Sequence, residues 1–203
     1  MQTIAALIFP DFELLDLCGP MEFFGLLPDD YQITLVAEEA GPVQSYQKVP
    51  MIAEKPMSEV TSADILFVPG GIGTRDTLTN QPLLDWIVAL DQVTQQTLSV
   101  CTGAGTLAKA GVLDGRRATS NKAAFNWITS LGPNVDWVKQ ARWVEDGKYF
   151  TSSGVSAGMD MTLAVIAKNQ GLEMAEKKAL WAEYQWHKDP DWDPFAKHHG
   201  LVP

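Results

Sequence analysis

The most informative stretch of this sequence is Leu98-Ser99-Val100-Cys101-Thr102-Gly103-Ala104-Gly105. Its apolar first half predicts a strand that ends at Cys101, and a helical pattern follows at once. A cysteine between a strand and a helix lies at the positive end of the helix dipole, which favours the thiolate. Ser99 and Gly103 flank Cys101 two positions away, as the glycines flank the serine of a nucleophile elbow. The pattern predicts a nucleophilic cysteine; the alternative is a buried structural cysteine.

Apolar runs alternate with helical patterns along the rest of the chain. Continuous apolar runs such as 4–9 and 63–68 are typical of buried parallel strands. The alternation predicts an α/β sandwich with a mostly parallel sheet, in which ligands bind at the carboxyl ends of strands. The predicted strands are 4–9, 32–38, 63–68, 98–100, 117–120, 136–139, 141–145 and 148–151, with short edge strands within 43–53; the predicted helices are 20–27, 82–93, 102–110, 122–130, 156–169 and 172–186.

Domain organisation follows from the same pattern. No repeat or linker interrupts the chain, so residues 1–203 are predicted to form a single domain with an irregular C-terminal tail, 187–203. Pro20 fits the first position of helix 20–27, with Gly19 as its cap. In the tail, Trp192 and Phe195 are predicted to anchor onto the body or onto a partner subunit.

Composition narrows the class of protein. The 203 residues carry a net charge of −10, which argues against a nucleic-acid partner. No apolar run is long enough to span a membrane. The first residues lack the basic region and cleavage site of a signal peptide, and the two cysteines suit a reducing compartment. These features predict a cytoplasmic protein with free thiols.

Two further groups of residues are candidates for the site. Asp16 lies between leucines, where a carboxylate needs a partner or a raised pKa, and either would suit a general acid or base beside a cysteine. The alternative is a helix cap, a role that Gly19 and Pro20 already fill in part. Glycines in the segment 70–73 after a strand could offer backbone amides to a developing negative charge. The donors are Gly71 or Ile72, with Gly73 beside them and the Thr102 amide opposite; the alternative is a plain tight turn.

Other chemistries find less support. The segment 103–108 fits a dinucleotide fingerprint weakly, because no acidic residue follows at the next strand end. His187, His198 and His199 all lie near the C-terminus, so a Cys-His pair would need the tail to fold back over the elbow. No cluster has the spacing of metal ligands, so we expect neither a metal nor another cofactor.

Five segments together resemble the ThiJ/PfpI superfamily, which is related to class I glutamine amidotransferases. The resemblance covers nearly the whole chain and implies a flavodoxin-like three-layer sandwich with a nucleophile elbow. It is carried by Phe9-Pro10-Asp11-Phe12-Glu13-Leu14-Leu15-Asp16, Val68-Pro69-Gly70-Gly71-Ile72-Gly73, Ser99-Val100-Cys101-Thr102-Gly103, Leu113-Asp114-Gly115-Arg116-Arg117-Ala118-Thr119 and Ser156-Ala157-Gly158-Met159-Asp160.

Departures from the family pattern indicate the subgroup. Protease-like and glyoxalase-like members have glutamate in the first loop and histidine after the cysteine, whereas this chain has Asp16 and Thr102. Asp16 and Thr102 resemble the isocyanide hydratases, which implies a small-molecule isocyanide substrate, a covalent cysteine thioimidate and Cys101, Asp16 and Thr102 as catalytic residues. The alternatives are a redox-sensing or ligand-binding module without turnover, or a glyoxalase or deglycase. The same loop occurs in sensor domains of transcription regulators, whose DNA-binding module would need a longer chain. The superfamily habit and the tail aromatics imply a homodimer.

Overall fold

The centre of the molecule is a seven-stranded sheet in the computed structural model, which describes residues 1–203. Its strands are β1 (Gln2–Leu7), β2 (Tyr31–Ala37), β5 (Lys55–Pro56), β6 (Ile65–Val68), β7 (Gln96–Ser99), β10 (Trp143–Asp146) and β11 (Tyr149–Ser152). They lie in the order β10-β11-β7-β6-β1-β2-β5, and all neighbours are parallel except β10 and β11. The predicted mostly parallel sheet is confirmed.

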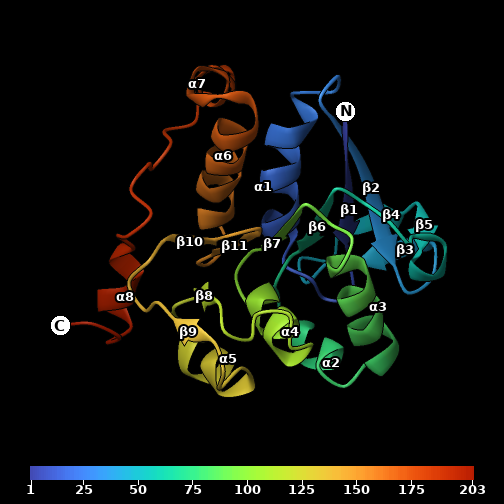
Figure 1. Ribbon diagram of the computed structural model, residues 1–203, viewed down its shortest axis with the longest axis horizontal. Helices are drawn as coiled ribbons and strands as arrows, with labels where there is room; N and C mark the ends of the chain where they lie inside the picture. Colours follow the sequence, from blue (N-terminus) through green and yellow to red (C-terminus); the bar gives the residue numbers. More distant parts are fainter.

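Helices cover both faces of this sheet (Figure 1). On one face lie α1 (Leu14–Gly25), α6 (Ala157–Gln170) and α7 (Leu172–Trp181); on the other lie α2 (Thr74–Thr77), α3 (Gln81–Asp91) and α4 (Gly103–Lys109), with α5 (Phe125–Leu131) against α4. The smaller elements are η1 (Met57–Glu59), the pair β3 (Gly41–Gln44) and β4 (Pro50–Ala53), the pair β8 (Arg117–Ala118) and β9 (Asp136–Trp137), and α8 (Pro194–His198). The result is the predicted three-layer α/β sandwich.

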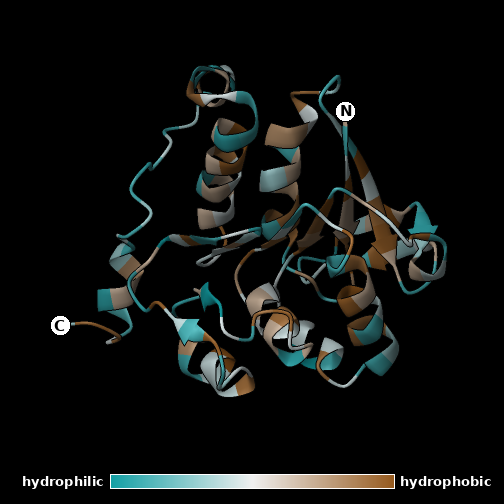
Figure 2. Ribbon diagram, in the orientation of Figure 1, coloured by the Kyte–Doolittle hydropathy of each residue, from teal (hydrophilic) through white to brown (hydrophobic).

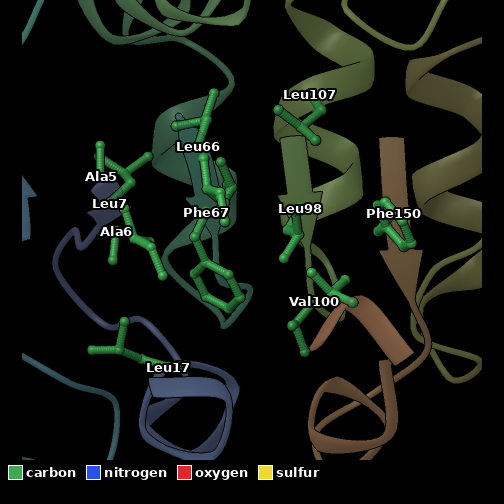
Figure 3. Packing of buried hydrophobic residues seen from close by; sticks show 14 of the residues in the cluster. Ala5, Ala6, Leu7, Leu17, Leu66, Phe67, Leu98, Val100, Leu107 and Phe150 are labelled. Carbon is green, nitrogen blue, oxygen red and sulfur yellow. The ribbon is translucent and has the colours of Figure 1, made fainter. Parts of the chain in front are cut away.

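The central strands are apolar because both of their faces are covered. Figure 2 shows brown, hydrophobic ribbon at the middle of the sheet, and β6 is buried at all four of its positions. In Figure 3, Leu17 of α1 and Leu107 of α4 pack from opposite sides onto the strand residues, among them Leu66 and Leu98. The α6 helix has eight buried residues, as its apolar sequence predicted. No helix combines the length and apolar character that crossing a membrane requires.

The start of α1 differs from the prediction. The helix begins at Leu14, and Pro20 lies inside it instead of at its first position. A proline inside a helix removes one hydrogen bond and costs about 3 kcal/mol, but burial of Leu17 and Phe24 offsets this loss. Gly19 is not a cap: a Cβ there would lie 2.7 Å from Met159 Cγ of α6, so glycine permits close packing of the two helices. The earlier start places Asp16 in the first turn of α1.

The C-terminal tail is also more regular than predicted. Asp193 caps the short helix α8 by accepting a hydrogen bond of 2.9 Å from the Phe195 amide, and Pro194 follows at its first position. Trp192 and Phe195 are 43% and 52% exposed, so each is only partly covered by the body of the chain. The buried residues of α8 and its cap are Ala196 and Asp193.

Candidate active site

Four chain segments meet at the carboxyl edge of the sheet. Asp16 follows β1, Gly70 follows β6, Cys101 follows β7 and Val155 follows β11. These four strands are parallel neighbours, and Val68 of β6 lies in register with Ser99 of β7, so the segments that follow them begin side by side. The structure therefore brings the predicted Asp16, Gly70–Gly73 and Cys101 segments together, at the place where open α/β sheets bind ligands.

Gly70 permits this convergence. A Cβ at this position would lie 2.5 Å from the Thr102 nitrogen and 2.9 Å from Asp16 Oδ2, closer than atoms can approach without displacement. The Gly70 amide donates a hydrogen bond of 3.0 Å to Asp16 Oδ2. Gly70 thus joins the three predicted segments.

Asp16 is a fully buried carboxyl group. Its Oδ1 has no hydrogen-bond partner of regular geometry, and its side chain interacts directly with Cys101. Burial raises the pKa of Asp16 to about 7, and the hydrogen bond from Gly70 opposes part of this rise. Near neutral pH the group exists in both protonation states, as a general acid and base requires.

The raised pKa of Asp16 predicts how stability depends on pH. Because the folded pKa of about 7 lies above the unfolded value of 3.8, the folded state loses stability as pH rises from about 4 to 7. The full loss is at most about 4 kcal/mol. Asp16→Asn should remove this loss, so the free energy of unfolding of the variant relative to wild type should be higher at pH 8 than at pH 4.5. Urea unfolding at the two pH values measures it; equal pH dependence in both proteins would contradict the assignment.

Cys101 occupies the strand-to-helix turn that the sequence predicted. Its φ of +59° is unusual for a residue with a side chain and matches a strained nucleophile elbow. The turn is held by its own backbone: the Cys101 amide donates to the Ser153 carbonyl at 3.0 Å, and the Cys101 carbonyl accepts from Ser120 Oγ at 2.8 Å. The Cys101 backbone, and with it the position of the sulfur, is therefore held by Ser120 and Ser153, which were not predicted as site residues.

The predicted resting thiolate is wrong. Burial raises the pKa of the Cys101 thiol well above its ordinary value, and the adjacent Asp16 carboxylate raises it further. The backbone amides of Thr102 and Val155 favour the charged form but do not outweigh burial, since Cys101 is only 6% exposed. At neutral pH the sulfur keeps its proton, and Asp16 is the group beside it that can accept one.

Thr102 and the glycine turn are bound to each other. Thr102 Oγ1 accepts from the Gly71 amide at 2.9 Å and shares a hydrogen bond of 2.8 Å with Thr74 Oγ1. The Gly73 amide donates to the Asp11 carbonyl at 3.1 Å. The amides of Gly71 and Gly73 are thus engaged within the fold, which favours a positioning role for them over the predicted stabilisation of charge. Ile72 is 46% exposed beside them.

Val155 is a site residue that sequence reasoning missed. Its backbone amide faces both Asp16 and Cys101 and favours the charged form of each. Its φ of +48° is a strained conformation for a β-branched residue. Nothing in the identity of a valine signals such a backbone; only the preceding Gly154 marked a turn.

The histidines and the nearby cavities do not contact Cys101 directly. None of the three histidines hydrogen-bonds Cys101 or Asp16, although His199 and Phe195 of the tail line a cavity of about 210 Å³ next to Val155. A second cavity, of about 280 Å³, lies beside Leu15 and Cys18. Cys101 lines neither cavity, and a cavity of about 400 Å³ near Pro10 and Gly73 also excludes it. No group of three or more His, Cys, Asp or Glu side chains is placed to hold a metal ion.

Residues 2–168 match the model of the DJ-1/PfpI family. The chain belongs to the DJ-1/PfpI family. Among the family's curated members, an isonitrile hydratase from Pseudomonas putida is 33% identical over 89% of this chain and 78% of its own length. The HTH-type transcriptional regulator CdhR of Pseudomonas aeruginosa is 30% identical over 72% of this chain, but only 43% of that regulator is covered.

Solved structures of the DJ-1/PfpI family share the fold. A ThiJ/PfpI family protein from Pseudomonas syringae superimposes with a TM-score of 0.84 at 30% identity, over 91% of this chain and 75% of that one. A cysteine-to-alanine mutant of a DJ-1 superfamily protein from Salmonella typhimurium gives a TM-score of 0.80 at 25% identity, over 92% and 100% of the two chains. The predicted superfamily and its flavodoxin-like sandwich are confirmed.

Proposed function

We propose that this protein is an isocyanide hydratase, which adds water to R–N≡C and releases the formamide R–NH–CHO. The observation that carries the proposal is the buried pair of Cys101 and Asp16, which interact directly without any histidine. The 33% identity to an isonitrile hydratase over most of the chain supports the same substrate.

The first half of the reaction uses the proton of the Cys101 thiol. Asp16, ionised in part because its pKa is about 7, accepts this proton as the sulfur attacks the terminal isocyanide carbon. One electron pair of the C–N multiple bond moves to the nitrogen, the carbon keeps its own lone pair and carries the negative charge, and protonated Asp16 returns the proton to that carbon. The product is a thioimidate, R–N=CH–S, bonded to Cys101, and Asp16 is again a carboxylate.

The second half uses the same carboxylate on water. Asp16 takes a proton from water as the oxygen attacks the thioimidate carbon, and it passes that proton to the nitrogen. The tetrahedral adduct R–NH–CH(OH)–S then collapses: the C–S bond breaks, a C=O bond forms, and the hydroxyl proton returns through Asp16 to the sulfur. The products are R–NH–CHO and the free thiol, so one water is consumed and one carboxyl group serves both halves.

Backbone amides assist by holding negative charge on the sulfur. The amides of Thr102 and Val155 both favour the charged form of Cys101, so they oppose the cost of burying a thiolate as it forms and leaves. The hydroxyl of Thr102, bound to Gly71 and Thr74, keeps the Thr102 amide in place. Gly71, Ile72 and Gly73 form the adjoining wall.

The chemistry of the substrate suits the apolar side chains around Cys101. The side chains exposed around the site are apolar, with Leu15 at 39%, Ile72 at 46% and Val155 at 36% exposure. An isocyanide has few hydrogen-bonding groups, so apolar surroundings accommodate it more readily than a polar amide.

Incubation with p-nitrophenyl isocyanide tests the function, with formamide formation followed by absorbance. We expect steady turnover near neutral pH. No formamide from the folded wild-type protein would remove the proposal. Lactate from methylglyoxal in the same preparation would instead indicate a glyoxalase.

A ligand-binding module without turnover is the second candidate, because regulators such as CdhR share 30% identity with this chain. Redox sensing by Cys101 is less favoured, since its raised pKa leaves little of the thiolate that oxidants attack. Such a module would bind an isocyanide, or acquire an oxidised Cys101 detectable by mass spectrometry, without releasing product.

We also propose that the protein is a cytoplasmic homodimer. Trp192 and Phe195 are 43% and 52% exposed, so about half of each side chain is available to a partner subunit. Sedimentation equilibrium should give a mass near twice the 22.3 kDa of one chain. Trp192→Ala with Phe195→Ala should shift the population toward monomer, and a dimer unchanged by both substitutions would place the interface elsewhere.

A further inference from the structure

A buried group of charges lies behind Val155, outside the pair of Asp16 and Cys101. Arg142 donates from Nε to Asp160 Oδ2 at 2.7 Å, and its Nη1 lies 4.0 Å from Asp193 Oδ2. The Arg142 side chain is 9% exposed and both carboxylates are completely buried. Burying three charges is costly, and such groups add little net stability even when paired. Their arrangement therefore calls for an explanation other than stability.

Arg142 holds both ends of the segment that carries Val155. Its carbonyl accepts from the Ser153 amide at 2.8 Å, and its Nη2 donates to Ser156 Oγ at 3.4 Å. Between these two points the chain adopts the strained φ of Val155, which persists only where surrounding contacts enforce it. Ser153 also accepts from the Cys101 amide, so the same segment contacts the elbow directly.

The C-terminal tail supplies the other contacts of this charged group. Asp160 Oδ1 accepts from Tyr184 Oη and from the His187 amide, each at 2.9 Å. The Arg142 amide donates to the Pro190 carbonyl at 2.7 Å, and Asp193 brings the second carboxylate. Figure 1 shows the tail running from α7 along α6 to α8, so that it closes over this region.

We propose that Arg142, with Asp160 and the tail residue Asp193, is a positioning unit that holds the Val155 amide against Cys101 and Asp16. Arg142 touches none of the reacting atoms; it acts through the segment 153–156. The C-terminal tail thereby becomes a functional part of the active site. The inference rests on the proposed function only in taking Cys101 as the reactive residue.

The test is the rate of Cys101 alkylation by iodoacetamide as a function of pH, in a Cys18→Ser background with one remaining thiol. The charged group that faces Cys101 is Asp16 of α1, with Glu13 beyond it; buried Lys122 donates to the Ala141 carbonyl, and its charge interacts with Asp193 and Arg142. Displacing the Val155 amide, which favours the thiolate, should slow alkylation of Arg142→Met at pH 8 about tenfold and move the profile to higher pH. Arg142→Lys should recover part of the rate.

The matched control is Lys168→Ala. Lys168 and Glu145 form an exposed ion pair of 2.5 Å between α6 and β10, the strand that follows Arg142, and neither residue lies near Val155 in the chain, so its loss should leave the profile unchanged. A folded Arg142→Met protein with the parent profile would overturn the proposal.

If Arg142→Met does not fold, the Asp193→Asn variant tests the proposal in its place. It removes the charge that faces Arg142 but keeps an oxygen to cap α8. It should shift the profile in the same direction by a smaller amount, and an unchanged profile would overturn the proposal. Alkylation needs no isocyanide, so a wild-type protein without hydratase activity would remove the proposed function and leave this test intact.

Discussion

Cys101→Ala is expected to abolish hydration of p-nitrophenyl isocyanide while leaving the fold intact. Without the sulfur no thioimidate can form, and the remaining carboxylate would have to activate water against a free isocyanide. Turnover should fall to the uncatalysed background. Because Cys101 lies in a buried turn held by backbone contacts, alanine removes one atom of the side chain and keeps those hydrogen bonds. The measurement is formamide formation, with circular dichroism and thermal unfolding to establish that the variant is folded.

Cys18→Ser provides the matched control for this prediction. Cys18 is the second free cysteine, half-buried on α1 only two residues from Asp16. It has no contact with the reacting groups in the proposed mechanism, so its variant should keep turnover within about threefold of wild type. Normal turnover by Cys101→Ala, or equal loss in both variants, would contradict a covalent role for Cys101.

Asp16→Asn is expected to lower kcat by about 10²–10⁴-fold, the usual contribution of a general acid and base. Asparagine keeps an oxygen for the Gly70 amide, but it can neither accept the thiol proton nor deliver it to carbon. In wild type, activity should rise with pH through about 7 as Asp16 ionises, because the carboxylate is the form that receives the proton. The variant should lack this inflection. Steady-state kinetics from pH 5 to 9 measure both effects.

Glu13→Gln separates the proton transfer from general electrostatics. The Glu13 charge raises the pKa of Asp16, so its removal should move the inflection to lower pH and leave maximal turnover within about threefold. Turnover by Asp16→Asn within about threefold of wild type would remove Asp16 from the mechanism.

The thiolate prediction failed for a reason of burial. Position at the start of α4 does supply the Thr102 amide, and that amide favours charge on the sulfur. The sequence pattern contains no measure of how much solvent reaches that turn, or of how close Asp16 of α1 would lie. Both depend on contacts between segments 85 positions apart in the chain.

The prediction about α1 failed differently and with less consequence. Pro20 and Gly19 carry the local signals of a helix start, and those signals are ordinarily reliable. Packing against α6 overrode them, because Gly19 lets Met159 approach and the buried Leu17 stabilises the preceding turn. The conclusion that Asp16 lies in an apolar setting rested on its neighbouring leucines and not on this helix start, and Asp16 is fully buried.

Sequence by itself determined the α/β alternation, the elbow at Cys101 and the meeting of three loops at one sheet edge. Those features follow from local periodicity and from the rule that parallel strands share a carboxyl edge. Only the tertiary structure decided the protonation of Cys101, the strained amide of Val155 and the inclusion of the tail through Asp193. Burial and long-range contact set these properties, and they arise only when segments distant in the chain exclude water from one another.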